Sequence, residues 1–244
     1  MKVSRYKKDD AVTYALGATV VMEFLNFAPE VLTGVIMHPA FRSEDTIAKI
    51  KEITANNRIP LSTEEKPFNI LSQKENCFVI GVINKNASVL KTNLNEGSHV
   101  VLVNPSNAGN LGTIIRSCAG FGVKDIAIVT PAVDHFDPKT IRASMGALAK
   151  VNIETFSSFE DYKERFPDNN YYPFMLDGST LLQETNINEP FSLIMGNEAT
   201  GLPSEFQKVG QPVRIEHTSN IDSLNLTIAT SIALYEATKS RFKS

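Results

Sequence analysis

The 244-residue sequence has no tryptophan, only two cysteines and no long apolar run. Cys77 and Cys118 lie far apart without the spacing of metal ligands, so the sequence indicates two reduced thiols rather than a zinc site. No stretch approaches the ~18 apolar residues of a membrane span. At the start of the chain, Asp9 and Asp10 interrupt the basic residues, which argues against a secretory signal. These absences favour a cytoplasmic protein without a metal or a membrane anchor.

The chain also lacks an excess of positive charge. Its net charge is −3 and its isoelectric point is about 5.9, so a nucleic-acid partner would need a local basic patch. One candidate patch is the segment MKVSRYKK, which contains Lys2, Arg5, Lys7 and Lys8. A solvated basic N-terminus explains this segment equally well, and both interpretations stay open.

The length of the chain favours two domains. A stretch rich in Asn, Lys and Ser at residues 84–98 has weak periodicity and predicts a linker. We therefore expect a small α/β domain over residues 1–92 and a larger α/β domain over residues 97–244. In the small domain, apolar spacing predicts helices over 11–27 and 43–57 and strands over 31–38 and 75–83.

From His99 onward, strand and helix signals alternate more strongly. Alternation at these intervals predicts a mostly parallel sheet that is covered by helices on both faces. The expected strands are 99–103, 124–130, 171–176, 191–195 and 212–215, and the expected helices are 110–121, 139–149, 158–166, 203–209 and 223–242.

The segment NPSNAGNLGTIIRSCAGFG, residues 104–122, follows an apolar strand and opens a helix. It lacks the glycine order of a dinucleotide-binding loop and the Gly-Lys-Ser/Thr ending of a triphosphate-binding loop, so both kinds of loop are disfavoured. The missing dinucleotide fingerprint also disfavours a nucleotide-dependent oxidoreductase. Arg116 stands one turn after Gly112, so we expect its guanidinium to lie over that glycine and to reach back toward the helix start. Unpaired N–H groups there favour an anion, here a substrate phosphate, and Asn110 adds an amide. A surface arginine beside a capped helix is the alternative.

Two further strand-to-loop corners carry polar residues. Glu198 follows the strand 191–195, and ligands bind outside the carboxyl ends of strands in open α/β sheets. A solvated glutamate in a glycine-rich turn is the alternative. Ser223 and Asn225 stand at the start of the last helix. Serine is a common N-cap, so Ser223 has an ordinary structural explanation, whereas Asn225 inside the first turn has less of one.

Together, the three corners NLGTIIR, IMGNEATGL and SLNLTIA resemble the signature of the SpoU family of RNA 2′-O-ribose methyltransferases, and PKTIRASMGAL matches a segment common in that family. The resemblance covers residues 97–244. It implies an α/β methyltransferase domain with a C-terminal trefoil knot, S-adenosylmethionine as the cofactor, an RNA substrate and a homodimer with the site near its interface. More loosely, YALGATVVMEFLN resembles the smaller N-terminal α/β domain, of ribosomal-protein-like fold, with which many members bind RNA.

The resemblance also implies roles for individual residues. The catalytic residues that it implies are Asn110, Arg116, Glu198, Ser223 and Asn225. The cofactor-binding residues that it implies are Leu176, Gly196, Asn197, Ile215, Ser219 and Leu224. One loop departs from the family pattern, because Glu216, His217 and Ser219 stand where many members have a Pro-Met-like pair and a glycine.

The expected reaction is methylation of a ribose 2′-hydroxyl, with ribosomal RNA favoured because the N-terminal segment resembles that of rRNA-modifying members. The alternatives are a tRNA 2′-O-methyltransferase and a non-catalytic RNA-binding protein with a decayed methyltransferase domain. The resemblance casts Arg116 as the group that takes the hydroxyl proton, yet arginine is effectively always protonated. Either a substrate phosphate helps Arg116 to release a proton, or Arg116 clamps phosphate and hydroxyl while another group takes the proton.

Overall fold

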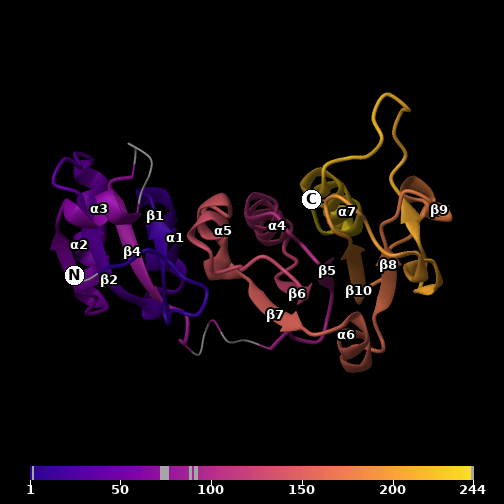
Figure 1. Cartoon of the computed structure of the whole chain (residues 1–244), viewed down its shortest axis with the longest axis horizontal. Coiled ribbons are helices and arrows are strands. Elements are labelled where there is room, and N and C mark those ends of the chain that lie inside the picture. Colours follow the sequence, from indigo (N-terminus) through magenta and orange to yellow (C-terminus); the bar gives the residue numbers. More distant parts are fainter. Residues whose placement is uncertain (2, 72–76, 88–89, 91–92, 243–244) are drawn as a thin grey trace.

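The computed structural model describes residues 1, 3–71, 77–87, 90 and 93–242. The chain forms a four-stranded sheet from its N-terminal part and a five-stranded sheet from its C-terminal part, arranged along the long axis of the molecule (Figure 1). Lys2, two residues of the expected strand 75–83 and part of the expected linker 84–98 lie outside the described residues. Among the residues that are described, no helix has the length and apolar character to cross a membrane.

The N-terminal sheet has the strand order β1-β4-β2-β3. Strand β4 runs antiparallel to β1 and β2, and β3 runs parallel to β2. The predicted strands 31–38 and 75–83 and the predicted helix 43–57 are confirmed as β2, β4 and α2, whereas the short β3 and α3 were not predicted. The bounds are β1 Val12–Leu16, α1 Ala18–Phe27, β2 Leu32–Met37, α2 Glu44–Asn56, β3 Leu61–Thr63, α3 Lys66–Leu71 and β4 Val79–Asn84.

The helix predicted over residues 11–27 is wrong in its first part, because residues 12–16 form strand β1 and the helix begins only at Ala18. Every β1 residue after Val12 is buried, so the strand lacks the apolar–polar alternation by which a half-buried strand is recognised. Gly17 separates the two elements with φ 110°, a conformation that glycine adopts without steric cost.

The C-terminal sheet has the order β7-β6-β5-β10-β8, and all of its strands are parallel. Alternate strand residues pack on opposite faces: Val100 and Leu102 pack with α4, α5 and α7, while Val101 and Val103 pack with α6 and η5. The predicted parallel sheet with helices on both faces is therefore confirmed. The bounds are β5 His99–Val103, α4 Ala108–Phe121, β6 Asp125–Val129, α5 Pro138–Ala143, η3 Ala147–Lys150, β7 Asn152–Phe156, α6 Phe159–Arg165, β8 Asn170–Pro173, β9 Thr180–Leu181, β10 Phe191–Met195, η5 Ser204–Lys208, β11 Val213–Arg214, α7 Leu226–Thr238 and η6 Lys239–Phe242.

Three helices of the C-terminal part differ from the prediction. The helix predicted over 139–149 ends at Ala143, because the chain turns left-handed at Met145 and Gly146, with φ 53° and 84°. A Cβ atom on Gly146 would lie 2.6 Å from the Cβ of Glu23, so α1 of the N-terminal part requires this glycine. The segment predicted as helix 203–209 is the 3₁₀ helix η5, and the last helix spans 226–238 rather than 223–242, followed by η6. Strands β7 and β9 were not predicted.

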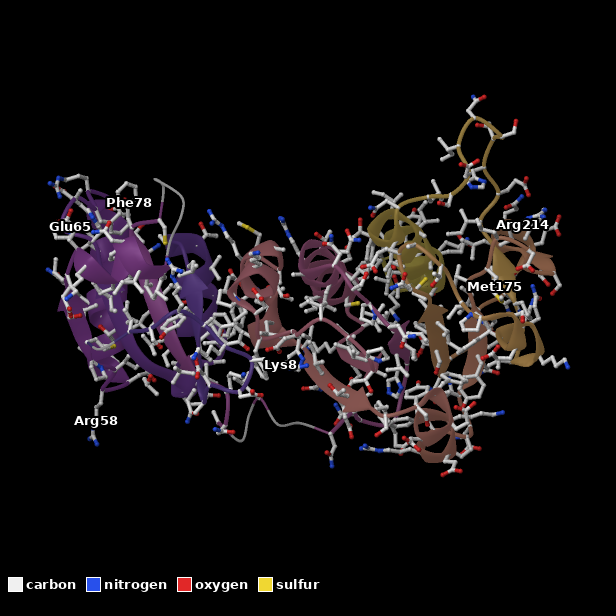
Figure 2. All side chains as sticks on the ribbon, in the orientation of Figure 1. Lys8, Arg58, Glu65, Phe78, Met175 and Arg214 are labelled. Carbon is white, nitrogen blue, oxygen red and sulfur yellow. The ribbon has the colours of Figure 1, made fainter. Side chains whose placement is uncertain are left out.

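Polar contacts and one continuous hydrophobic core join the two sheets. Tyr6 donates a hydrogen bond to Asp134, and Lys85 donates to the Tyr6 hydroxyl at 3.0 Å. Burial and the bond to Asp134 raise the pKa of Tyr6, so this hydroxyl stays protonated and donates. Lys85 also donates to the backbone oxygen of Lys8, which lies between the two parts of the molecule (Figure 2). The N-terminal segment is thus attached to the loop that precedes α5.

Candidate active site

Two loops meet where the order of the C-terminal sheet changes direction. Strand β5 pairs with β6 on one side and with β10 on the other, and Leu102 of β5 is in register with Met195 of β10. Both strands therefore end at the same edge of the sheet. Ligands of open parallel sheets bind in the crevice at such a switch point.

Glu198, in the loop after β10, holds this loop against the loop after β5. Its Oε2 accepts hydrogen bonds from the backbone N and the hydroxyl of Ser106, at 3.0 and 2.7 Å. Its Oε1 accepts from the backbone N of Asn107 at 3.1 Å and from Nδ2 of Asn110 at 3.3 Å. Because Asn107 is the N-cap of α4, the Glu198 carboxylate provides the negative charge at the start of this helix. A substrate phosphate at this helix start stays a prediction, and it would have to bind beside the Glu198 carboxylate.

The environment of Glu198 also determines its ionisation. Partial burial by itself would raise the pKa of Glu198, but the hydrogen bonds from Ser106 and Asn107 outweigh burial and lower the pKa below the ordinary glutamate value. The carboxylate is therefore ionised at neutral pH, and both of its oxygens are already engaged. This arrangement suits a group that holds two loops together better than a group that accepts a proton.

A cavity of about 310 Å³ lies beside these loops. Its walls come from residues 174–177 after β8 and 195–202 after β10, from 213–215 and His217 around β11, and from Ser223, Leu224, Leu226 and Ala229 at the start of α7. Seven residues predicted from the sequence line it, namely Leu176, Gly196, Asn197, Glu198, Ile215, Ser223 and Leu224. Four predicted residues do not line it, namely Asn110, Arg116, Ser219 and Asn225.

Close backbone packing shapes the loop that follows β10. A Cβ atom on Gly196 would lie 2.2 Å from the backbone carbon of Gly201, so no larger residue fits there. Asn197 exchanges two backbone hydrogen bonds with Gly201, at 3.1 and 2.9 Å. Its side-chain Nδ2 donates to the backbone oxygen of Asn104 at 2.8 Å. The amide of Asn197 thus fixes the cavity wall to the end of β5.

Several residues that line the cavity were not predicted. Met175 and Asp177 follow β8, and Figure 2 shows Met175 near Arg214 of β11. The backbone N of Met175 donates to the carbonyl of Val213 at 2.9 Å, which brings these two strand ends together. The rule that singled out Glu198, a polar residue beyond the carboxyl end of a strand, also applies to Asp177.

The start of α7 differs from the sequence-based interpretation. Asn225, not Ser223, is the N-cap, and its Oδ1 accepts hydrogen bonds from the backbone N and the hydroxyl of Thr227, at 2.8 and 2.6 Å. Ser223 lies before the helix and lines the cavity. The prediction that Asn225 lies inside the first turn is therefore wrong, and its side chain has a capping role.

Gly112 does not make room for Arg116. A Cβ atom on Gly112 would lie 2.4 Å from the backbone oxygen of Thr140 and 2.5 Å from the Cβ of Ala143, so the glycine permits α5 to pack against α4. Arg116 is exposed and has no hydrogen bond or ion pair with any other described residue. Beside it, Ser117 meets Ser231 of α7 at 2.9 Å. Arg116 thus stands on the surface of α4, between the helices that flank it.

The model of the family described as SpoU rRNA Methylase matches residues 97–235. This range contains both loops of the switch point and every residue that lines the cavity. The chain belongs to the SpoU rRNA methylase family.

This SpoU-family chain resembles curated relatives and solved structures over different lengths. It is 29% identical over 140 residues to the ribosomal RNA small subunit methyltransferase G 2 of Syntrophobacter fumaroxidans, covering 57% of this chain and 27% of that protein. It is 27% identical over 146 residues to the putative tRNA (cytidine(34)-2′-O)-methyltransferase of Listeria innocua, covering 57% of this chain and 86% of the relative. The AdoMet-bound rRNA methyltransferase of Sinorhizobium meliloti superposes with a TM-score of 0.77 at 26% identity, over 96% of this chain and 89% of that chain. The chain spans between about a quarter and a half of the length of the first curated relatives that it matches.

In this SpoU-family member, the loop that departs from the sequence signature also contributes to the cavity. Glu216 accepts a hydrogen bond from Nη2 of Arg214 at 2.9 Å, and His217 lines the cavity. The departure therefore places a histidine in the cavity wall and an ion pair beside it.

Proposed function

We propose that this protein is an S-adenosylmethionine-dependent methyltransferase that acts on a ribose 2′-hydroxyl of ribosomal RNA in the cytoplasm. The observation that carries the proposal is the cavity at the switch point. Two of the three signature corners, IMGNEATGL and SLNLTIA, contribute residues to its wall. Glu198 connects this wall to the third corner, NLGTIIR. The whole-chain similarity to an AdoMet-bound rRNA methyltransferase supports the same cofactor and substrate class.

The cavity fits a cofactor of this type. Its volume of about 310 Å³ is at the lower end of the range for small-molecule sites, roughly 300–1,000 Å³. Leu176, Ile215 and Leu224 offer apolar walls for the adenine, and the backbone at Gly196 and Asn197 offers polar groups. When bound, S-adenosylmethionine supplies a methyl group on a sulfonium, and transfer of that group to a ribose oxygen releases one proton.

Arg116 is the residue that we assign to the reacting nucleotide. Its guanidinium has no partner among the described residues, so it is available to a phosphate and a neighbouring hydroxyl, and its planar fork suits such a pair. We infer that Arg116 positions the substrate, because aligning the oxygen with the methyl carbon accounts for much of the rate in a displacement reaction. Asn110 and Glu198 support this by fixing the start of α4.

We further infer that the C-terminal end forms a trefoil knot and that two copies pair through α7. In support of the knot, α7 packs against α4 through Ser117 and Ser231, while Leu226 and Ala229 of the same helix line the cavity. In support of the dimer, a stripe at i, i+4 and i+7 of α7 is exposed and apolar: Ile228, Ile232 and Tyr235 are 51%, 37% and 57% exposed. Ser117, which follows Arg116 in α4, meets Ser231, which precedes Ile232 in α7, and this contact supports a site near the proposed interface.

The lengths of the matches favour ribosomal RNA over transfer RNA. The tRNA-directed relative matches over most of its own length and leaves much of this chain without a counterpart. The rRNA methyltransferase of Sinorhizobium meliloti matches 96% of this chain and therefore includes the N-terminal sheet. We assign residues 1–92 to RNA binding and residues 97–244 to methyl transfer on this basis.

Two measurements test the proposal. Calorimetric titration of the purified protein with S-adenosylmethionine should show binding, and absence of binding favours a non-catalytic RNA-binding protein instead. Mapping of ribose methylation in ribosomal and transfer RNA, from cells with and without the gene, should show one ribosomal 2′-O-methyl group that disappears. Loss of a transfer-RNA methyl group instead would correct the substrate.

A further inference from the structure

A second cavity lies between the N-terminal sheet and α5, away from the candidate active site. Its volume is about 810 Å³. One wall consists of Arg5, Tyr6, β1 residues and the end of α3, and the other wall consists of residues 137–143 at α5. Figure 1 shows α5 between β1 and α4, so this cavity opens between the two parts of the molecule. We call it the inter-sheet cleft.

Three basic side chains line the inter-sheet cleft, from both of its walls: Arg5, Lys139 and Arg142. None of their cationic groups has a hydrogen bond or an ion pair with another residue in the described part of the chain. Arg142 is half-buried, whereas Arg5 and Lys139 are exposed. In contrast, Lys85 and Lys150, at the same junction, are both ion-paired.

The cleft has a positive local charge although the chain as a whole carries −3. Asp137 is the one acidic residue among the described residues of its walls, and its Oδ1 already accepts a hydrogen bond from the backbone N of Lys139 at 2.7 Å. Unpaired cations that converge from two walls attract a polyanion more than a single small anion, because each can contact a different charged group. A chain of phosphodiesters has this distribution of charge.

The cleft also leads toward Arg116. Gly112 of α4 lies against Ala143, the residue after Arg142, as the close approach of their atoms shows. Arg116 is four residues further along α4, which corresponds to a rise of about 6 Å on the same side of the helix. An RNA strand that leaves the cleft beside Arg142 therefore has to cross only the contact between α5 and α4 to reach the exposed guanidinium of Arg116.

We propose that the inter-sheet cleft binds the phosphate backbone of the RNA substrate, with Arg5, Lys139 and Arg142 as the phosphate contacts, and guides it to Arg116. The proposal rests on the proposed function, because it assigns a place to the RNA of that reaction. An acidic protein partner is the competing occupant of the cleft.

The test compares the triple variant Arg5→Gln, Lys139→Gln and Arg142→Gln with a matched variant, Lys124→Gln, Lys163→Gln and Lys208→Gln. The matched variant removes the same charge from exposed positions of the C-terminal part, outside the cleft. The probe is a fluorescein-labelled single-stranded RNA of mixed sequence, titrated by anisotropy between about 50 and about 200 mM KCl. Each phosphate contact to a single strand contributes about 0.7 to the slope of log K against log salt, so the cleft variant should lower the slope by about 2.

The expected result is RNA binding at least tenfold weaker in the cleft variant and nearly unchanged in the matched variant. S-adenosylmethionine affinity by calorimetry and the melting temperature should equal those of the unaltered protein in both variants. The charge-conserving variant Arg5→Lys with Arg142→Lys should retain the salt slope.

Two results overturn the proposal, and they are distinguishable. In the first, the unaltered protein binds RNA and the cofactor, and the cleft variant keeps its RNA affinity and its salt slope. The cleft then does not bind RNA, although the proposed function stands. An acidic protein partner becomes the occupant to test. If the unaltered protein binds the cofactor and no RNA under any salt condition, the cleft proposal and the proposed function both fail.

Discussion

Replacement of Glu198 by glutamine is the most informative single perturbation of the candidate active site. Each carboxylate oxygen accepts two hydrogen bonds, and one donor in each pair is a backbone N–H, which cannot accept. Whichever oxygen becomes an NH₂ group therefore faces a backbone N–H and loses that hydrogen bond. Hydrogen bonds to a charged group contribute about 1.5–3 kcal/mol each, and partial exposure of Glu198 reduces the total loss to about 2 kcal/mol.

Two assays follow from this magnitude. The melting temperature should fall by about 4–8 °C, because 1 kcal/mol corresponds to roughly 2–4 °C in a chain of this size. Since residues 196–202 line the cavity, S-adenosylmethionine affinity should fall as well, by up to about 30-fold if the whole loss appears as loop opening. The control is Glu205→Gln, an exposed glutamate without a hydrogen bond to another described residue. Unchanged stability and affinity in Glu198→Gln would show that the two loops hold their positions without this carboxylate.

The remaining predictions concern the fold and the reaction. Gly112→Ala should lower the free energy of unfolding in urea by about 1–3 kcal/mol, because its Cβ would lie 2.4 Å from a backbone oxygen of α5. Gly120→Ala, whose Cβ would meet no atom within 4 Å, should raise that free energy by about 0.5–1 kcal/mol. Equal effects of the two substitutions would contradict the packing argument. Tyr162→Phe should cost about 1–3 kcal/mol, because its hydroxyl lies 2.7 Å from Nδ1 of buried His99, and a neutral change would mean that this bond contributes nothing. Burial lowers the pKa of His99. Below about pH 6.5, the unfolded chain therefore binds a proton at this residue that the folded chain does not bind. The free energy of unfolding should decrease as the pH falls from about 6.5 toward the lowered pKa of His99. Arg116→Lys should keep RNA affinity but lose most methyl transfer in a radiolabelled-methyl assay, because lysine keeps the charge without the planar fork. Near-normal turnover would refute the assignment of Arg116 to substrate positioning.

Much of the C-terminal fold was predictable because its signals are local. Leu111, Ile114, Ile115 and Cys118 recur at helical spacing, and all are buried on the sheet as predicted. The strands at 99–103 and 191–195 are buried throughout and largely apolar, because parallel strands are covered on both faces. The same property concealed β1, whose buried residues show no alternation and continue smoothly into the helix that follows Gly17.

The candidate site was predicted in composition but not in arrangement. Seven of the predicted residues line one cavity, and the resemblance to the SpoU family is sufficient to find them. Their roles depend on contacts between distant segments. Glu198 and Ser106 are far apart in sequence, so the contact that brings a carboxylate to the start of α4 is invisible to local spacing. The interpretation of Gly112 failed for a similar reason, because the atoms that require a glycine belong to α5.

Periodicity and short motifs were enough to predict the class of the fold, most strands and helices of the C-terminal part, and the family, whereas strands β7 and β9 escaped prediction. Which charges are satisfied and which are available depends on the folded chain. It paired Glu198 with the start of α4, left Arg116 exposed, and gathered Arg5, Lys139 and Arg142 in one cleft. The physical reason is that hydrogen bonds and Coulomb interactions act over a few ångströms in space, irrespective of how many residues separate the partners along the chain.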